Sequence, residues 1–184
     1  MTTALTDELV GTYTLDASHT RIGFSARHAM VTKVRGAFNE FEGSAKLPTP
    51  DPSTWSVEVT IQAASIDTRN EQRDGHLRSN DFLALDQYPT ITFRSTSVEP
   101  VDETTFRVNG DLTIRGVTRP VSVDFEYQGA AKDPFGNSRV GFEGSASISR
   151  KDFGITFNAA LDTGGVLVSD KIQIEFDVSA IRTS

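Results

Sequence analysis

The sequence has no cysteine among its 184 residues, which excludes disulfide bonds and thiolate metal sites. Its three histidines, His19, His28 and His76, form no pair at metal-ligand spacing, so the sequence predicts no metal site. No stretch of about 18 apolar residues is present to form a transmembrane helix. Neither a G-x-S-x-G nucleophile motif nor a phosphate-binding glycine loop occurs. These absences predict a domain that requires no cofactor.

Basic residues are in the minority, with 18 Lys and Arg against 25 Asp and Glu, and the net charge is −7. Phosphate contacts need clustered Lys and Arg, so we expect no nucleic-acid partner. Residues 1–10 include Asp7 and Glu8 and lack the basic and apolar regions of a signal peptide. The sequence as written therefore predicts a flexible segment over residues 1–10, one domain over residues 11–184, and a cytoplasmic protein.

The dominant pattern is an alternation of apolar and polar residues, which is the period of a half-buried β-strand. Between positions 20 and 28, Ile22, Phe24 and Ala26 share one face, and His28 ends that face. The same alternation recurs in five further segments, 55–63, 106–114, 121–127, 140–148 and 172–178. Two more segments, 35–47 and 90–98, bring the number of expected strands to about eight.

One-sided alternation is typical of antiparallel sheets that bury one face. About eight strands joined by turns favour a closed up-and-down barrel, because closure removes unpaired strand edges; a β-sandwich is the alternative. Phe38 and Phe41 are out of phase by one residue, and a β-bulge around residues 39–40 would place both on the inner face.

A short helix interrupts the strands between the third and the fourth. Thr68 and Glu71 have the spacing of a capping box, which predicts Thr68 as the N-cap of a helix that runs to about Asn80. Such a helix could lie across one end of the barrel, followed by Phe82 and Leu83.

The inner faces mix large and small residues, and this mixture permits a hollow barrel. The large inward residues are Phe24, Phe93, Phe125, Phe142 and Phe176, and the small ones are Ala26, Gly43, Ala45, Ala63, Gly110, Gly144 and Ala146. Either the small residues leave a cavity that the aromatic rings line, or the two sizes interdigitate into a filled core. His28 is the one ionisable residue among the assigned inward positions.

A basic cluster, Arg69, Arg73, His76 and Arg78, lies on the expected helix. The arginines could clamp the phosphate of a ligand, because guanidinium groups match phosphate oxygens; the alternative is a solvated helix face paired with Glu71, Asp74 and Asp81. The run Asp16, Ser18 and His19 brings three catalytic residue types together, but adjacency does not supply the geometry of a triad, and we interpret it as a turn before a strand.

Several ordered segments carry a family resemblance. They are Tyr13-Thr14-Leu15-Asp16 with Ser18-His19, Ile22-Gly23-Phe24, Val34-Arg35-Gly36-Ala37-Phe38, Asp81-Phe82-Leu83 with Tyr88-Pro89, Ile91-Thr92-Phe93-Arg94-Ser95, Gly110-Asp111-Leu112-Thr113-Ile114-Arg115-Gly116-Val117-Thr118 and Arg150-Lys151-Asp152-Phe153-Gly154. Through them the chain resembles the bacterial YceI-like family of lipocalin-like, polyisoprenoid-binding proteins, from about residue 11 to residue 181. Each segment is weak alone, and their order and spacing together make the match strong.

The resemblance implies an all-β, eight-stranded antiparallel lipocalin-like barrel around a long apolar tunnel, and a homodimer. The implied ligand is an isoprenoid lipid, either an isoprenoid quinone or a polyprenyl phosphate. Many similar proteins are periplasmic, and this sequence departs from them in lacking a signal peptide.

We therefore predict a protein that binds, stores or transports an isoprenoid lipid and is not an enzyme. The candidate ligand-binding residues are Phe24, His28, Phe38, Phe41, Phe82, Leu83, Phe93, Phe125, Phe142 and Phe176, with Arg69, Arg73 and Arg78 as candidates for head-group contact. Two alternatives remain: an isomerase- or cyclase-type enzyme acting on a lipid held in the barrel, and a non-catalytic structural or stress-related module with a filled core.

Overall fold

The computed structural model describes residues 4–29, 31–158 and 168–184, most of them in one antiparallel sheet. The helices are α1 (Leu5–Glu8) and α2 (Glu71–Arg78), and short 3-10 turns form η1 (Pro52–Thr54), η2 (Ala63–Ser65) and η3 (Arg150–Phe153). The strands are β1 (Gly11–Leu15), β2 (Arg21–His28), β3 (Thr32–Phe38), β4 (Phe41–Leu47), β5 (Ser56–Gln62), β6 (Ile66–Asp67), β7 (Thr90–Pro100), β8 (Thr105–Ile114), β9 (Val117–Lys132), β10 (Ser138–Ser149) and β11 (Lys171–Arg182).

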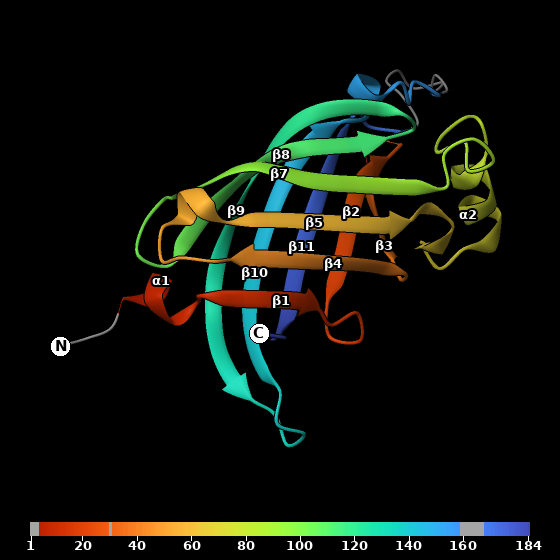
Figure 1. Ribbon diagram of the computed structural model, residues 1–184. Coiled ribbons are helices and arrows are strands. Elements are labelled where there is room, and N and C mark those ends of the chain that lie inside the picture. The colour runs from red at the N-terminus through yellow and green to blue at the C-terminus, as the bar shows by residue number, and fades with distance from the viewer. Residues whose placement is uncertain (1–3, 30, 159–167) are drawn as a thin grey trace.

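Eight of these strands close the barrel in the order β1-β4-β5-β7-β8-β9-β10-β11, and β11 pairs back with β1 (Figure 1). Every pairing in the ring is antiparallel. The predicted closed barrel is therefore confirmed, and the alternative of a β-sandwich is wrong because the β1–β11 pairing leaves the ring without a free edge.

Three strands, β2, β3 and β6, lie outside this ring of eight. Strand β11 pairs with β2 through residues 173–177 and with β1 through residues 180–182. The hairpin β2–β3 and the short β6 thus extend the wall beyond β1, β4 and β5. At the expected bulge, β3 ends at Phe38 and β4 begins at Phe41, and both rings pack against one core cluster. An interrupted strand can change direction while its ladder continues.

Helix α2 lies between β6 and β7 in the chain, as predicted, and at one end of the barrel (Figure 1). The predicted N-cap is wrong. Asn70 caps the helix, and its side-chain oxygen accepts from the backbone N–H of Arg73 at 3.0 Å. Thr68 is buried instead, and its hydroxyl donates to the carboxylate of Asp74 at 2.5 Å. The helix ends at Arg78, before the expected Asn80.

The opposite end of the barrel carries α1 (Figure 1). Residues 1–10 are expected to be flexible, yet residues 5–8 form this short helix and Leu9 after it is only 1% exposed. Burial of a leucine side chain is worth roughly 1.5–3 kcal/mol, which favours docking of the segment over a loose tail.

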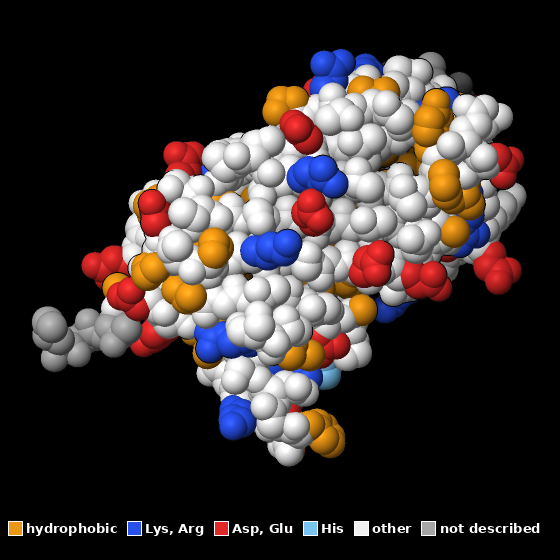
Figure 2. Space-filling model, viewed as in Figure 1, with side chains coloured by type: hydrophobic (Ala, Val, Ile, Leu, Met, Phe, Trp, Pro, Cys, Tyr) orange, Lys and Arg blue, Asp and Glu red, His pale blue; other side chains and the backbone are white. Residues whose placement is uncertain are grey.

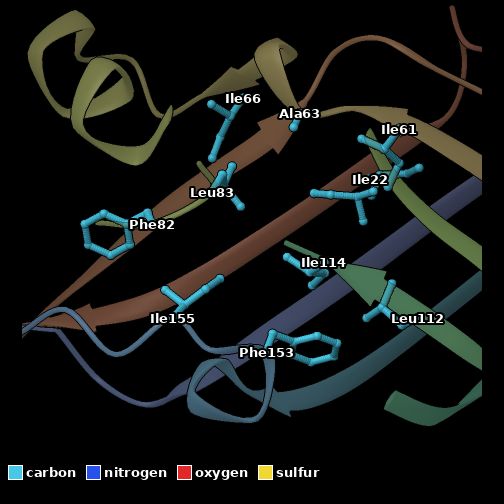
Figure 3. Close-up of a cluster of buried hydrophobic side chains, with 11 residues drawn as sticks. Ile22, Ile61, Ala63, Ile66, Phe82, Leu83, Leu112, Ile114, Phe153 and Ile155 are labelled. Atoms are coloured by element: carbon cyan, nitrogen blue, oxygen red, sulfur yellow. The ribbon is translucent and has the colours of Figure 1, made fainter. Parts of the chain in front are cut away.

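The buried side chains form two clusters. One lies toward α2 and includes Ile66, Phe82, Leu83 and Phe153 (Figure 3). The other lies toward α1 and includes Leu9, Tyr13, Trp55 and Phe106. On the face in Figure 2, charged side chains are scattered over the barrel wall and both ends, and hydrophobic side chains lie between them. The barrel interior therefore has two apolar ends, and what lies between them decides what it can bind.

Candidate functional site

A cavity of about 730 Å³ runs between the two clusters, and residues of both clusters line it. Its lining is almost entirely apolar and comes from the inward faces of the barrel strands. A volume of this size lies within the range of roughly 300–1,000 Å³ that is typical of ligand pockets. The alternative of a core filled by side chains is therefore not what this chain builds.

The aromatic rings leave the lumen open because several of them lie against the backbone of a glycine on the neighbouring strand. A Cβ atom at Gly110 would come within 2.5 Å of the ring of Phe93, and one at Gly144 would come within 2.8 Å of the ring of Phe125. The small size of these glycines suggests that they add volume to the cavity directly, but they do not. They let the rings lie on the wall, and Ala26, Ala45 and Ala146 line the cavity themselves.

The α1 end of the cavity is closed. Leu9, Tyr13 and Trp55 line this end, and each is 6% exposed or less. The hydroxyl of Tyr13 donates to the carbonyl of Leu9 at 2.9 Å and accepts from Arg182 at 2.8 Å, and the indole N–H of Trp55 donates to the carbonyl of Thr49 at 2.8 Å. Their polar atoms are satisfied within the protein, so this end presents an apolar surface to the lumen.

The α2 end forms the mouth. The lining residues His28, Asn70, Gln72 and His76 are all exposed, and they come from the end of β2 and from α2 with its cap. The ring of His76 stands edge-on to Phe82 and to Phe157, with centroid distances of 5.0 and 4.9 Å. A polar rim thus surrounds an apolar channel at this end, an arrangement that suits a ligand with a long tail and a polar head.

Nine of the ten residues predicted to bind ligand line this cavity: Phe24, His28, Phe38, Phe82, Leu83, Phe93, Phe125, Phe142 and Phe176. Phe41 does not. It packs against the α2-side cluster without being part of the lining, although it lies on the same face of β4 as Ala45 and Leu47, which line the cavity. Contact of these residues with a ligand stays a prediction.

The arginines of the basic cluster lie in different surroundings. Arg73 lines the cavity but donates to the hydroxyl and the carbonyl of Thr68 at 2.7 and 2.6 Å. Arg78 donates to the carbonyls of Ala64 and Ile66, and Arg69 lies outside the lining. The two arginines therefore fasten the helix to the barrel rim, and Arg73 alone of the three borders the mouth.

The acids of α2 do not pair with these arginines in the described residues. Asp74 is buried and accepts from the backbone N–H and the hydroxyl of Thr68. Asp81 bonds to Nε2 of His76 at 2.9 Å. Of the charge pairs expected for a solvated helix face, the structure thus has His76 with Asp81 and, in the described residues, none that involves the arginines.

Sequence reasoning missed Arg150, which is 3% exposed and lines the mouth side of the cavity. Its guanidinium donates to four backbone carbonyls, those of Ile155, Phe157, Val168 and Ser169, at 2.8–3.1 Å. Burial lowers the pKa of this guanidinium, against the opposing field of Asp170. Arg150 thereby positions Phe157 and Val168 on the lining. The only sequence signal is its place in the segment Arg150 to Gly154, which carried the family resemblance.

The Asp16, Ser18 and His19 group lies on the outside of the barrel in a turn, as predicted. Asp16 and Ser18 both approach Nδ1 of His19, at 2.7 and 3.1 Å, whereas a catalytic triad needs acid and nucleophile on opposite ring nitrogens. Hydrogen bonds from Ser18, Arg139 and His19 hold the pKa of Asp16 far below its usual value. Among the described residues, no group of His, Asp and Glu is arranged to hold a metal ion, and no described helix is long and apolar enough to cross a membrane.

Comparison with known proteins identifies relatives over nearly the full chain. Residues 13–180 match the YceI-like domain family. A UPF0312 protein of Staphylococcus aureus (strain N315) is 40% identical over 164 residues, which cover 89% of this chain and 93% of that protein.

Three solved structures have the same fold. The Campylobacter jejuni YceI protein is 30% identical with a TM-score of 0.72, covering 86% of this chain and 90% of that chain. Burkholderia cenocepacia BcnA has a TM-score of 0.78 at 24% identity, covering 90% and 98%. A polyisoprenoid binding domain from Saccharophagus degradans has a TM-score of 0.70 at 16% identity, covering 92% and 98%.

Proposed function

Because this chain belongs to the YceI-like family, we propose that its barrel binds one long isoprenoid lipid and stores or transports it without chemical change. The observation that carries the proposal is the cavity: about 730 Å³ of apolar space with one closed end and one polar mouth. A structural relative described as a polyisoprenoid binding domain supports the class of ligand.

Burial of the tail supplies the driving force. Each buried methylene gains about 0.8 kcal/mol, so roughly ten buried carbons gain about 8 kcal/mol, which corresponds to a Kd of about 1 μM before the cost of immobilising the ligand. The lining offers few polar groups that would have to be desolvated. An apolar chain is therefore a sufficient ligand, and no catalytic step is needed to explain the cavity.

The ligand is oriented by the difference between the ends. The tail lies toward Leu9, Tyr13 and Trp55, whose polar atoms are already bonded within the protein. The head group lies among His28, Gln72 and Arg73 at the mouth. Of the three arginines that line the cavity, Arg73 is bonded to Thr68 and Arg150 to four backbone carbonyls, which leaves Arg27. This favours a weakly charged head group such as a quinone over a phosphate clamped by several arginines.

Native mass spectrometry of the freshly purified protein, followed by lipid extraction, tests the proposal. We expect one bound species whose mass matches an isoprenoid, and displacement of it by added isoprenoid quinone more readily than by polyprenyl phosphate of equal chain length. A ligand-free mass that persists after incubation with both lipids would overturn lipid binding. Preference for the phosphate would overturn the head-group assignment alone.

The rival hypothesis is an isomerase or cyclase that acts on a lipid in the barrel. Such an enzyme needs an acid–base pair aimed at the buried chain. Away from the mouth, the ionisable residues of the lining are Tyr13, whose hydroxyl is bonded to Leu9 and Arg182, and Glu58, which is paired with Arg94. At the mouth, His76 is bonded to Asp81 on the exposed rim. We therefore propose binding without catalysis, and a new product after incubation with isoprenoid lipid would overturn it. The homodimer and the cytoplasmic location stay predictions.

A further inference from the structure

The hairpin β2–β3 has a charge pattern opposite to that of the whole chain. Between Asp16 and Glu40 the sequence has four Lys and Arg residues and no Asp or Glu, although the chain carries a net charge of −7. All 25 acidic residues lie outside this stretch. The hairpin is thus a local cationic element on an acidic protein.

Three of these cations gather on the outer face of the hairpin. Arg27 and Lys33 stand directly opposite each other across the two strands, and Arg35 follows Lys33 on the same face opposite Ser25. All three are exposed. Like charges directly opposite each other destabilise a strand pair, so this arrangement works against the fold. Local arrangements that cost stability are expected where a function requires them.

The acids on neighbouring elements do not neutralise this group. On the β11 side, Asp177 stands opposite Arg21 and Glu175 opposite Gly23, four residues before Arg27 on β2. Asp170 accepts from Ser149 and from the backbone of Lys151. On the β6 side, Asp67 stands opposite Ala37 and accepts from Asn39 and the backbone of Arg69. Within the described chain, Arg27, Lys33 and Arg35 make no ion pair.

The hairpin also borders the cavity mouth. The end of β2 borders the cavity through Ala26, Arg27 and His28, so Arg27 lies at the mouth as well as on the outer face. Strands β2 and β3 run on the α2 side of the barrel (Figure 1). The connection between the strands carries Val31, an apolar side chain that is 76% exposed. An exposed apolar tip flanked by cations fits the interface of an anionic bilayer, where apolar groups enter the headgroup region and cations meet phosphate.

We propose that the β2–β3 hairpin docks the protein on anionic membrane surfaces, so that the cavity mouth opens toward the bilayer that supplies or receives the ligand. The proposal rests on the proposed lipid binding for its purpose, but its physical basis is the charge and the tip of the hairpin. An alternative explanation for these cations is protection of an exposed strand edge, for which proteins often use lysine. Strand β3 has such an edge, because it pairs with β6 only at Ala37 and Phe38. Arg27, however, lies on β2, which is paired on both sides, so edge protection does not account for it.

Vesicle co-sedimentation tests the docking. The full chain is mixed with vesicles of phosphatidylcholine alone or with about one third phosphatidylglycerol, and neither contains isoprenoid. We expect binding to the anionic vesicles only, weakened by salt. Each cation near an anionic surface contributes about fivefold, so the triple variant Arg27→Gln, Lys33→Gln, Arg35→Gln should bind about a hundredfold more weakly.

The matched control changes the charge by the same amount elsewhere. Lys46→Gln, Arg94→Gln and Arg107→Gln remove three exposed cations from the barrel wall on β4, β7 and β8. This variant should bind anionic vesicles nearly as well as the wild type. Equal loss in both triple variants would overturn the proposal, because net charge rather than the hairpin would then govern binding.

A fluorescent probe locates the contact. Because the chain has no cysteine, Val31→Cys can be labelled alone with an environment-sensitive dye, and so can Phe135→Cys in the β9–β10 connection, where the native phenyl is 88% exposed. We expect a blue shift for the label at position 31 only. A shift at position 135 alone, no vesicle binding by the wild type, or tighter binding to duplex DNA than to anionic vesicles would each overturn the proposal.

The two proposals fail separately. Vesicle binding by a protein that never carries an isoprenoid would leave the docking and defeat the proposed function. A protein that carries an isoprenoid but does not bind anionic vesicles would support the proposed function and defeat the docking.

Discussion

The α1 end and the α2 end of the barrel bury similar apolar side chains but treat their polar groups differently. At the α1 end, Tyr13, Trp55 and Arg182 bond to partners inside the protein. At the α2 end, the side chains of His28 and Gln72 are exposed on the lining and make no hydrogen bond within the described residues. The polar groups of the α1 end are therefore satisfied by the protein itself. The α2 end retains side-chain donors and acceptors that can bond to a ligand.

The comparison shows how the two ends of one barrel can fix the orientation of a bound ligand. Apolar burial is non-directional and would accept a ligand either way round. The satisfied polar groups of the α1 end and the open ones of the α2 end break that symmetry, because a polar head group loses less hydration at the mouth.

The largest expected effect comes from removing the buried cation of the α2 end. Arg150→Met leaves four carbonyls without their donor, and each buried unsatisfied group costs about 1–3 kcal/mol. We expect a loss of about 3–5 kcal/mol of stability and a Tm about 10 °C lower, measured by thermal and denaturant unfolding. The neighbouring exposed Lys151→Met is the control and should change little. Equal stability of the two variants would contradict the role of Arg150.

Blocking the channel between the ends comes next. Ala146 lines the cavity, so Ala146→Trp fills space that the ligand tail needs, and we expect uptake of isoprenoid to fall about a hundredfold. The outward Ser145→Trp, one residue earlier on β10, should bind as the wild type does. Uptake by native mass spectrometry and the fold by circular dichroism provide the measurements. Unchanged uptake by a folded Ala146→Trp protein would place the ligand elsewhere.

A smaller effect should separate stability from binding at the closed end. Tyr13→Phe removes the hydroxyl that bonds Leu9 and Arg182 but keeps the ring on the lining. We expect a loss of about 1–3 kcal/mol of stability with ligand affinity unchanged. Tyr88→Phe is the control, because its hydroxyl makes no hydrogen bond among the described residues. A loss of affinity in Tyr13→Phe without a loss of stability would show that this end is not a closed wall.

The smallest expected effect is a pH dependence near the α1 end. Burial raises the pKa of Asp133, but bonds from Asn137 and Arg139 outweigh it and lower the pKa to about 2. A carboxylate with a depressed pKa in the folded state stabilises the protein above its unfolded pKa of about 4. That contribution is lost as pH falls from about 4 to about 2. We expect Asp133→Asn to flatten the pH dependence of the unfolding free energy in this window, and an unchanged slope would contradict the assignment.

The sequence analysis was strongest where the signal is local. Alternation identified the strands and the inward aromatic residues, because a period of two fixes which side chains share a face whatever lies opposite. It did not separate Phe41, which packs against the α2-side cluster, from the residues that line the cavity. It also failed for the cap of α2, because the hydroxyl of Thr68 found Asp74, a partner six residues away that a capping motif does not consider.

The arginines also show that local sequence patterns do not predict contacts between distant residues. Arg69, Arg73 and Arg78 have the sequence spacing of a clamp, but Arg73 and Arg78 bond to backbone and hydroxyl oxygens of residues 64–68. Arg150, which organises the mouth, has no local pattern that distinguishes it from a surface arginine. Which acceptor a long cationic side chain reaches depends on backbone brought close by folding.

The sequence by itself determined an all-β barrel with one apolar face on each strand, because apolar alternation is a property of each strand alone. Only the tertiary structure decided that the barrel is hollow, which end is closed and where the mouth lies. These depend on rings lying over glycines of neighbouring strands, on Leu9 docking at one end, and on a buried arginine joining segments far apart in the chain. Such contacts form between residues whose proximity exists only after the strands have paired.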